Sequence, residues 1–79
     1  MNTPTLSRAA RVLLGWQQGD LAEHSSVGIN TITRFESGKS SPHRSTLKLL
    51  TETFEKAGIE FLGADGGGPG VRLRALDKR

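Results

Sequence analysis

The stretch VGINTITRFESGK, residues 27–39, decides how this chain folds. Its apolar residues Val27, Ile32 and Phe35 fall at the spacing of one face of an α-helix. We therefore predict a helix from about Gly28 to Ser37, closed by Gly38, because glycine ends helices without backbone strain. The other face of this helix is mostly polar, so it needs an explanation other than packing.

A second short helix is predicted just before this one, over roughly Gln18 to Ser25. Leu21 and Ala22 are expected to face inward. Asp20 lies in the first turn, where a negative charge interacts favourably with the helix dipole. Two short helices separated by only a few residues form the helix-turn-helix arrangement.

The segment TPTLSRAARVLLG, residues 3–15, predicts a helix nearer the N-terminus. Thr3 suits the N-cap, Pro4 suits the first helical position, and Gly15 is a fitting stop. The apolar residues of the segment follow the pattern of a buried helical stripe, which comprises Leu6, Ala9, Ala10, Leu13 and Leu14.

A fourth helix follows the loop KSSPHRS. Leu47, Leu50, Phe54 and Ala57 recur at amphipathic spacing, and Gly58 ends the pattern. There is thus material for four helices around one small core.

A β-hairpin is predicted beyond this helix. The segments IEFL and VRLR alternate in polarity, and the glycine-rich turn GADGGGPG separates them. Glu60 and Arg72 face each other on one side of this hairpin. The other side is an apolar face that consists of Ile59, Phe61, Val71 and Leu73. Because an isolated hairpin is only marginally stable in water, this face packs either on the same chain's helices or on a second subunit.

Composition limits the classes of function. The chain has 79 residues, which suffices for one domain. Cysteine is absent, the net charge is +3 and the isoelectric point is about 10.0, so an anionic partner such as nucleic acid is favoured. No secretory signal or membrane-spanning run is present, and we expect a soluble cytoplasmic protein.

No enzyme or cofactor signature stands out. His24 and His43 lack neighbouring residues that would complete a metal site. The run GGGPG precedes no lysine and opens no helix, so it is a turn and not a phosphate-binding loop. We therefore expect no catalysis, no cofactor, no metal and no small-molecule ligand.

The run LGWQQGDLAEHSSVGINTITRFESGKSSPHRSTLKLL resembles the helix-turn-helix domain of the Xre/Cro and phage-repressor family. The resemblance extends from about Thr3 to Ala57, and the tail GIEFLGADGGGPGVRLR looks like that of small bacterial members with a C-terminal strand pair. It implies a mainly α, four-helix, lambda-repressor-like domain over residues 1–58. Residues 59–79 then form a β-extension and tail of the same domain.

The resemblance also implies roles for individual residues. The base-reading positions of the helix over residues 28–37 would be Ile29, Asn30, Thr33 and Arg34. The positions that contact DNA phosphates would be Gln18, Lys39, Arg44 and Thr46. Arg11 and Glu36 match a buried structural ion pair, while Gly28 stands where the family usually has a Ser or Thr N-cap. Trp16 is expected to cover the edge of the core.

We interpret the chain as a sequence-specific DNA-binding regulator of transcription that acts as a homodimer on double-stranded DNA with a two-fold-related operator. Its dimer contacts are expected at the apolar face of the hairpin or, if that face packs on its own helices, at the fourth helix or only on DNA. The alternative is a helix-turn-helix module that binds protein, as in an antitoxin or adaptor.

Overall fold

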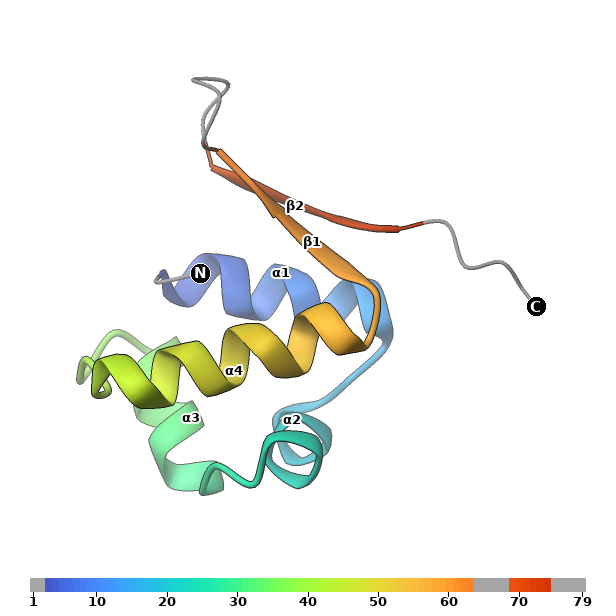
Figure 1. Cartoon of the computed structure of the whole chain (residues 1–79). Helices are drawn as coiled ribbons and strands as arrows, with labels where there is room; N and C mark the ends of the chain where they lie inside the picture. Colours follow the sequence, from blue (N-terminus) through green and yellow to red (C-terminus); the bar gives the residue numbers. More distant parts are fainter. Residues whose placement is uncertain (1–2, 64–68, 75–79) are drawn as a thin grey trace.

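The computed structural model describes residues 3–63 and 69–74, and in these ranges four helices precede a two-stranded antiparallel sheet (Figure 1). The elements are α1 (Pro4–Leu14), α2 (Gln18–Ser25), α3 (Ile29–Glu36), α4 (Arg44–Lys56), β1 (Ile59–Leu62) and β2 (Gly70–Leu73). The predicted fold, four helices with a C-terminal hairpin, is confirmed.

Single residues determine where α1 begins and ends and where α2 begins. The Thr3 hydroxyl accepts a hydrogen bond from the Leu6 N–H at 3.3 Å, and Gly15 closes α1 in the left-handed conformation at φ 71°. The Asp20 carboxylate accepts from the Gln17 N–H at 2.8 Å and caps the start of α2. These contacts satisfy backbone groups that a helix leaves free at its ends.

The core lies where α1, α2, α3 and α4 meet beneath the hairpin. Its fully buried apolar residues come from every helix and from β1: Ala10, Leu21, Ile32, Phe35, Leu50, Phe54 and Ile59. Leu14, Trp16, Ala22, Val27 and Leu47 pack against them with part of their surface exposed.

The predicted stripe of α1 was wrong at one position. Leu13 is 41% exposed, whereas the small polar residue Ser7 is fully buried. The buried side of α1 is turned toward Glu36 of α3, with which Ser7 and Arg11 form hydrogen bonds. An ion pair therefore sets the orientation of α1, and apolar periodicity alone does not reveal it.

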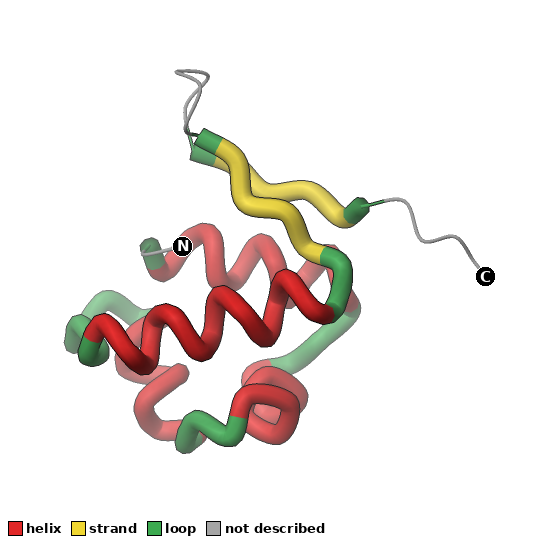
Figure 2. Tube along the Cα trace, viewed as in Figure 1, coloured by secondary structure: helices red, strands yellow, loops and turns green. Residues whose placement is uncertain are grey.

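The hairpin lies across the helices on the side away from α2 (Figure 2). Ile59 pairs with Leu73 and Phe61 with Val71, and the Arg72 guanidinium meets the Glu60 carboxylate at 3.0 Å. β1 packs on α4 and β2 packs on α1, where Phe61 and Val71 extend the core. The Arg74 N–H donates to the Gly58 carbonyl at 2.7 Å and fixes the far end of the ladder.

Candidate nucleic-acid interface

The outer face of α3 presents the four predicted base-reading residues to solvent. Ile29, Asn30, Thr33 and Arg34 are all exposed, and Ile29 retains 48% of its surface. No side chain caps the start of α3, so Asn30 is not used as a cap. The Asn30 amide and the Arg34 guanidinium form no hydrogen bond or ion pair with any residue that the structure describes. Both groups are available to an external partner.

Thr33 differs from its neighbours because its hydroxyl has a partner within the chain. It donates to the Gln18 side-chain oxygen at 2.9 Å. The amide nitrogen of Gln18 in turn donates to a carboxylate oxygen of Glu36 at 3.1 Å. Both the oxygen and the nitrogen of the Gln18 side-chain amide thus form hydrogen bonds with residues of α3, which fixes this side chain at the N-terminus of α2.

Glu36 is the buried anion to which several donors converge. Its side chain is 1% exposed, and Arg11 binds both carboxylate oxygens through Nε at 3.1 and 3.0 Å and one of them through Nη2 at 2.7 Å. The Ser7 hydroxyl donates to the second oxygen at 2.6 Å. Arg8 donates to the Glu36 backbone carbonyl, which lies at the end of α3.

The protonation of Glu36 follows from these contacts. Burial alone raises the pKa of its carboxyl, because a low-dielectric environment disfavours the charged form. The hydrogen bonds from Arg11, Ser7 and Gln18, together with the charge of Arg11, outweigh burial and lower the pKa below its usual value. Glu36 is therefore an anion at neutral pH, and α1 is fixed to α3.

Sequence reasoning identified Arg11 and Glu36 as a pair and missed the other members of this network. Ser7 lies one turn before Arg11 on the same side of α1, and that spacing was the available signal. Arg8 gave no signal, since an arginine on a helix is ordinarily solvated.

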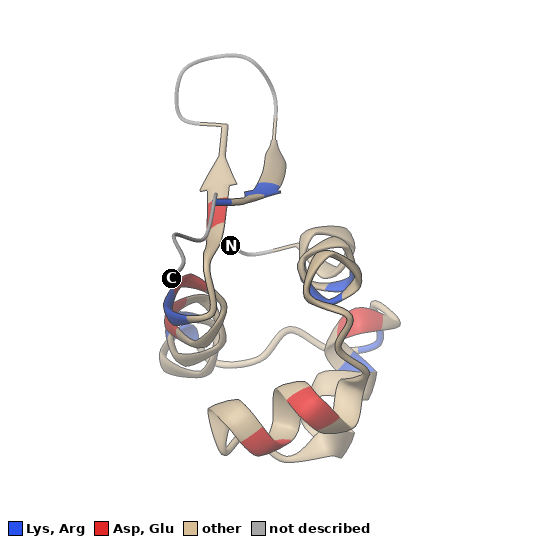
Figure 3. Ribbon diagram, turned by 90° about the vertical axis from the view of Figure 1, so that its right-hand side faces the viewer, with Lys and Arg blue, Asp and Glu red and all other residues tan. Residues whose placement is uncertain are grey.

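Exposed cations lie at the end of α3, in the loop that follows it and on the first half of α4. Arg34, Lys39, Arg44 and Lys48 are exposed, and none of them forms an ion pair within the described part of the chain. Thr46 is half-buried in the first turn of α4. Two acidic residues, Asp20 and Glu23, lie on α2, whose red segments Figure 3 shows at the bottom of the molecule, and Glu52 and Glu55 lie on the second half of α4. The loop after α3 and the start of α4 are thus the cationic flank of the exposed helix.

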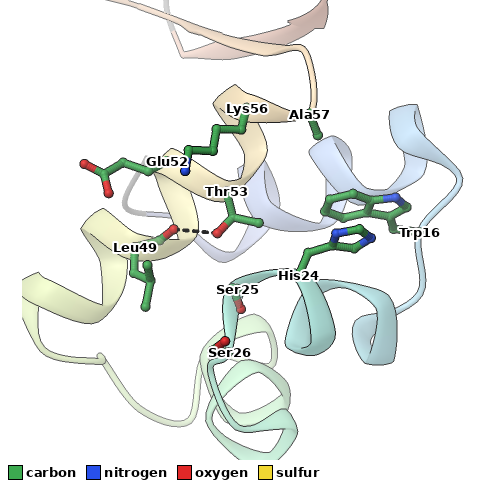
Figure 4. A pocket seen from close by; sticks show the side chains of 9 residues that line it. All are labelled: Trp16, His24, Ser25, Ser26, Leu49, Glu52, Thr53, Lys56 and Ala57. Carbon is green, nitrogen blue, oxygen red and sulfur yellow. Dashed lines mark hydrogen bonds between the residues drawn. The ribbon is translucent and has the colours of Figure 1, made fainter.

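A surface pocket between the ends of α2 and α4 lies outside this region (Figure 4). Trp16 and His24 form its wall as parallel rings with centroids 4.4 Å apart, and Trp16 also stacks on Phe54 at 6.0 Å. Trp16 is half-buried at the edge of the core, as expected. The hydroxyl of Thr53 is used within α4, since it donates to the Leu49 carbonyl at 2.8 Å.

The four residues predicted as dimer contacts lie mostly against the chain's own helices. Ile59 is 1% exposed, and Phe61 and Val71 are half-buried on the core. Leu73 remains 39% exposed at the open end of the ladder. The apolar face of the hairpin is thus the face that packs on α1 and α4.

In residues 3–63 and 69–74, no three His, Asp or Glu side chains come together in a way that could hold a metal ion. None of the helices in these ranges is long and apolar enough to cross a membrane.

The chain matches a known protein family. The chain fits a family model described as helix-turn-helix over residues 8–61, which is more than half of its length. The search of curated proteins finds no match.

Proposed function

Because this chain belongs to the Cro/C1-type, Xre-like family of helix-turn-helix proteins, we propose that α3 lies in the major groove of DNA and reads a specific operator. Proteins of this family are DNA-binding regulators of transcription. The proposal goes further in assigning the groove, the residues and a two-fold-related operator with half-sites about one helical turn apart.

The observation that carries the proposal is that the side chains of Asn30 and Arg34, on the exposed face of α3, have no partner among the described residues. An Asn side chain pairs with the edge of adenine through two hydrogen bonds, and an Arg does so with guanine. Asn30 and Arg34 are exposed without partners in the described residues, and so they are the base readers of this proposal. Ile29 and the methyl group of Thr33 supply apolar contact to thymine methyl groups.

Phosphate contacts hold the helix in position and add little sequence preference. Lys39 and Arg44 are exposed cations on the flank of α3. Thr46 lies in the first turn of α4, and Gln18 starts α2, whose N-terminal N–H groups favour an anion. Together these residues form the phosphate-contacting set of the proposal.

The test is a selection of binding sites from random double-stranded DNA, followed by binding measurements on the selected and on a scrambled site. We expect Arg34→Ala to relax the preference at one base position by about 1–3 kcal/mol. Lys39→Ala is the matched control, because it should weaken binding to both sites alike and lower the slope of log K against log salt by about 0.9.

Two outcomes would contradict this assignment. If Arg34→Ala and Lys39→Ala lowered affinity equally on both DNAs, Arg34 would not be a base reader. If the selection returned no sequence and binding were insensitive to salt, the surface would instead belong to the alternative function, contact with a protein as in an antitoxin or adaptor.

A further inference from the structure

The turn that follows α3 connects Lys39 to Arg34 through the backbone. The Lys39 N–H donates to the Arg34 carbonyl at 2.9 Å, and the Gly38 N–H donates to the Phe35 carbonyl at 3.0 Å. Gly38 has the left-handed φ of 79° that this pair of hydrogen bonds requires. The pattern is the Schellman motif, which commonly ends helices. Backbone bonds thus fix the proposed phosphate contact, Lys39, beside the proposed base reader, Arg34.

The last carbonyl of α3, that of Glu36, has its partner on another helix. A helix leaves the carbonyls of its last four residues without partners inside the helix. The carbonyls of residues 33–35 accept from N–H groups of residues 37–40. The carbonyl of Glu36 accepts from the Arg8 guanidinium of α1. Among the described residues, Arg8 is therefore the donor that completes the C-terminal end of α3.

Arg8 also brings positive charge to a place where α3 favours it. The carbonyls at the C-terminus of a helix carry a partial negative charge, and a cation beside them is stabilising. A second hydrogen bond, from Nη2 to the Thr5 hydroxyl at 3.3 Å, orients the guanidinium. The two ion pairs within the described part of the chain do not include Arg8. The end of α3 is thus the group that its charge meets.

Helix α1 holds Glu36 both by its side chain and by its backbone. Ser7 and Arg11 donate to the carboxylate, whereas Arg8 donates to the carbonyl. The carboxylate contacts fix α3 as a whole against α1. The carbonyl contact fixes the point at which the chain leaves α3, because Glu36 is the last residue of that helix. Loss of Arg8 should therefore loosen the turn and leave the buried ion pair intact.

We propose that Arg8 is a positioning residue for DNA recognition, which orders the end of α3 so that Arg34 and Lys39 meet the DNA in one fixed arrangement. It acts through the turn and does not itself contact DNA. The inference rests on the proposed function, because that function supplies the roles of Arg34 and Lys39. Without Arg8, the last turn of α3 frays, and DNA must order it on binding at a cost in entropy.

This cost applies mainly to the binding of a specific site. A base reader needs a fixed geometry for its two hydrogen bonds, whereas a phosphate needs only a nearby charge. Scrambled DNA is bound mainly through charge. The ratio of the affinities for the selected and the scrambled site is therefore the quantity that Arg8 raises.

Arg8→Met tests the inference, with Lys56→Met as the control that removes the same charge in the last turn of α4. Arg8→Met should lower the affinity for the selected site about three- to tenfold, as expected for one hydrogen bond, and that for scrambled DNA less than about twofold. The slope of log K against log salt should stay that of the wild type, since no phosphate contact is lost. Arg8→Lys, which keeps a cationic donor, should restore most of the preference, and Lys56→Met should change neither affinity.

Two further measurements separate positioning from a merely structural role. In an Arg34→Ala background, Arg8→Met should no longer change the ratio of the two affinities, because the base reader that it positions is absent. Amide hydrogen exchange of the protein without DNA should become faster at Lys39 in Arg8→Met. This increase should exceed any change at Leu50, a buried residue in the middle of α4.

Other results would overturn the inference. Equal weakening on both DNAs, with a salt slope lowered by about 0.9, would make Arg8 a phosphate contact itself. Unchanged binding to both DNAs, or exchange at Lys39 that changes no more than at Leu50, would leave Arg8 without a positioning role. A wild type without preference for any DNA would instead be a failure of the proposed function, and exchange at Lys39 would still decide whether Arg8 orders the turn.

Discussion

At the scale of single residues, Glu36 joins α3 to both α1 and α2. Its carboxylate receives hydrogen bonds from Ser7 and Arg11 of α1 and from Gln18 of α2. A buried ion pair of this kind fixes geometry without necessarily adding net stability. The direction in which α3 presents Asn30 and Arg34 thus depends on a polar network.

Removal of one partner of the buried pair should be costly. Arg11→Met leaves Glu36 charged and 1% exposed without its cation, and we expect a loss of about 3 kcal/mol in the free energy of unfolding. Arg72→Met is the control, because the Arg72–Glu60 pair is 63% and 40% exposed and should cost less than about 1 kcal/mol. Urea denaturation measures both, and equal losses would refute the special role of Glu36.

Thr33 provides a second test at this scale, because its hydroxyl and its methyl group imply different roles. If the hydroxyl positions Gln18 for a phosphate, Thr33→Val should weaken binding to all DNA sequences and lower the salt slope by about 0.9, while Thr33→Ser stays like wild type. If the methyl group reads a thymine, Thr33→Ser should alter the selected base and Thr33→Val should not. In a Gln18→Ala background the Thr33→Val effect should vanish.

At the scale of elements, α3 begins without a side-chain cap. Its N-cap is Gly28, at φ −60° and ψ 142°, and no side chain accepts the free N–H groups. A Cβ at this position meets nothing within 4 Å. The element that we propose for DNA recognition is therefore held by its packing and by Glu36 and not by its cap.

Gly28→Ser should strengthen this start. The conformation suits a serine N-cap and open space surrounds it, so we expect the free energy of unfolding to rise by a few tenths of a kcal/mol. Thermal melting measures the gain. Gly15→Ser is the opposing control, because φ 71° strains any side chain there and the melting temperature should fall. A lower melting temperature for Gly28→Ser would show that its hydroxyl finds no N–H group.

The sequence predicts those features of the helices that depend on neighbouring residues, and it does not predict contacts between different helices. The boundaries of α2 follow from sequence to the residue, and those of α3 to within one residue, because apolar spacing and glycine stops are local. The burial of Ser7 and the hydrogen bond between Thr33 and Gln18 were not predictable in this way. They depend on which side chains meet across helices, and a single sequence does not encode that in its periodicity.

At the scale of the whole molecule, acid should unfold the protein partly through Glu36. Its pKa is lowered in the folded state, so the unfolded chain binds a proton more readily. The stabilisation is present above the ordinary pKa of glutamate, about 4.3, and is lost as the pH falls through the folded-state pKa. We expect the melting temperature of the wild type to fall below about pH 4.5 and that of Glu36→Gln, already lower at pH 7, to fall less steeply.

The position of β2 against α1 has a consequence for synthesis on the ribosome. The side of α1 that packs against β2 stays uncovered until residues Gly70–Leu73 have been synthesised. Phe54 likewise lacks its edge contact with Phe61 until β1 has left the ribosome. Folding on the ribosome therefore ends late, because its last contacts join distant parts of the chain. Nascent chains that stall before residue 59 retain an uncovered apolar surface, and we expect proteases to clear them before they compete for DNA.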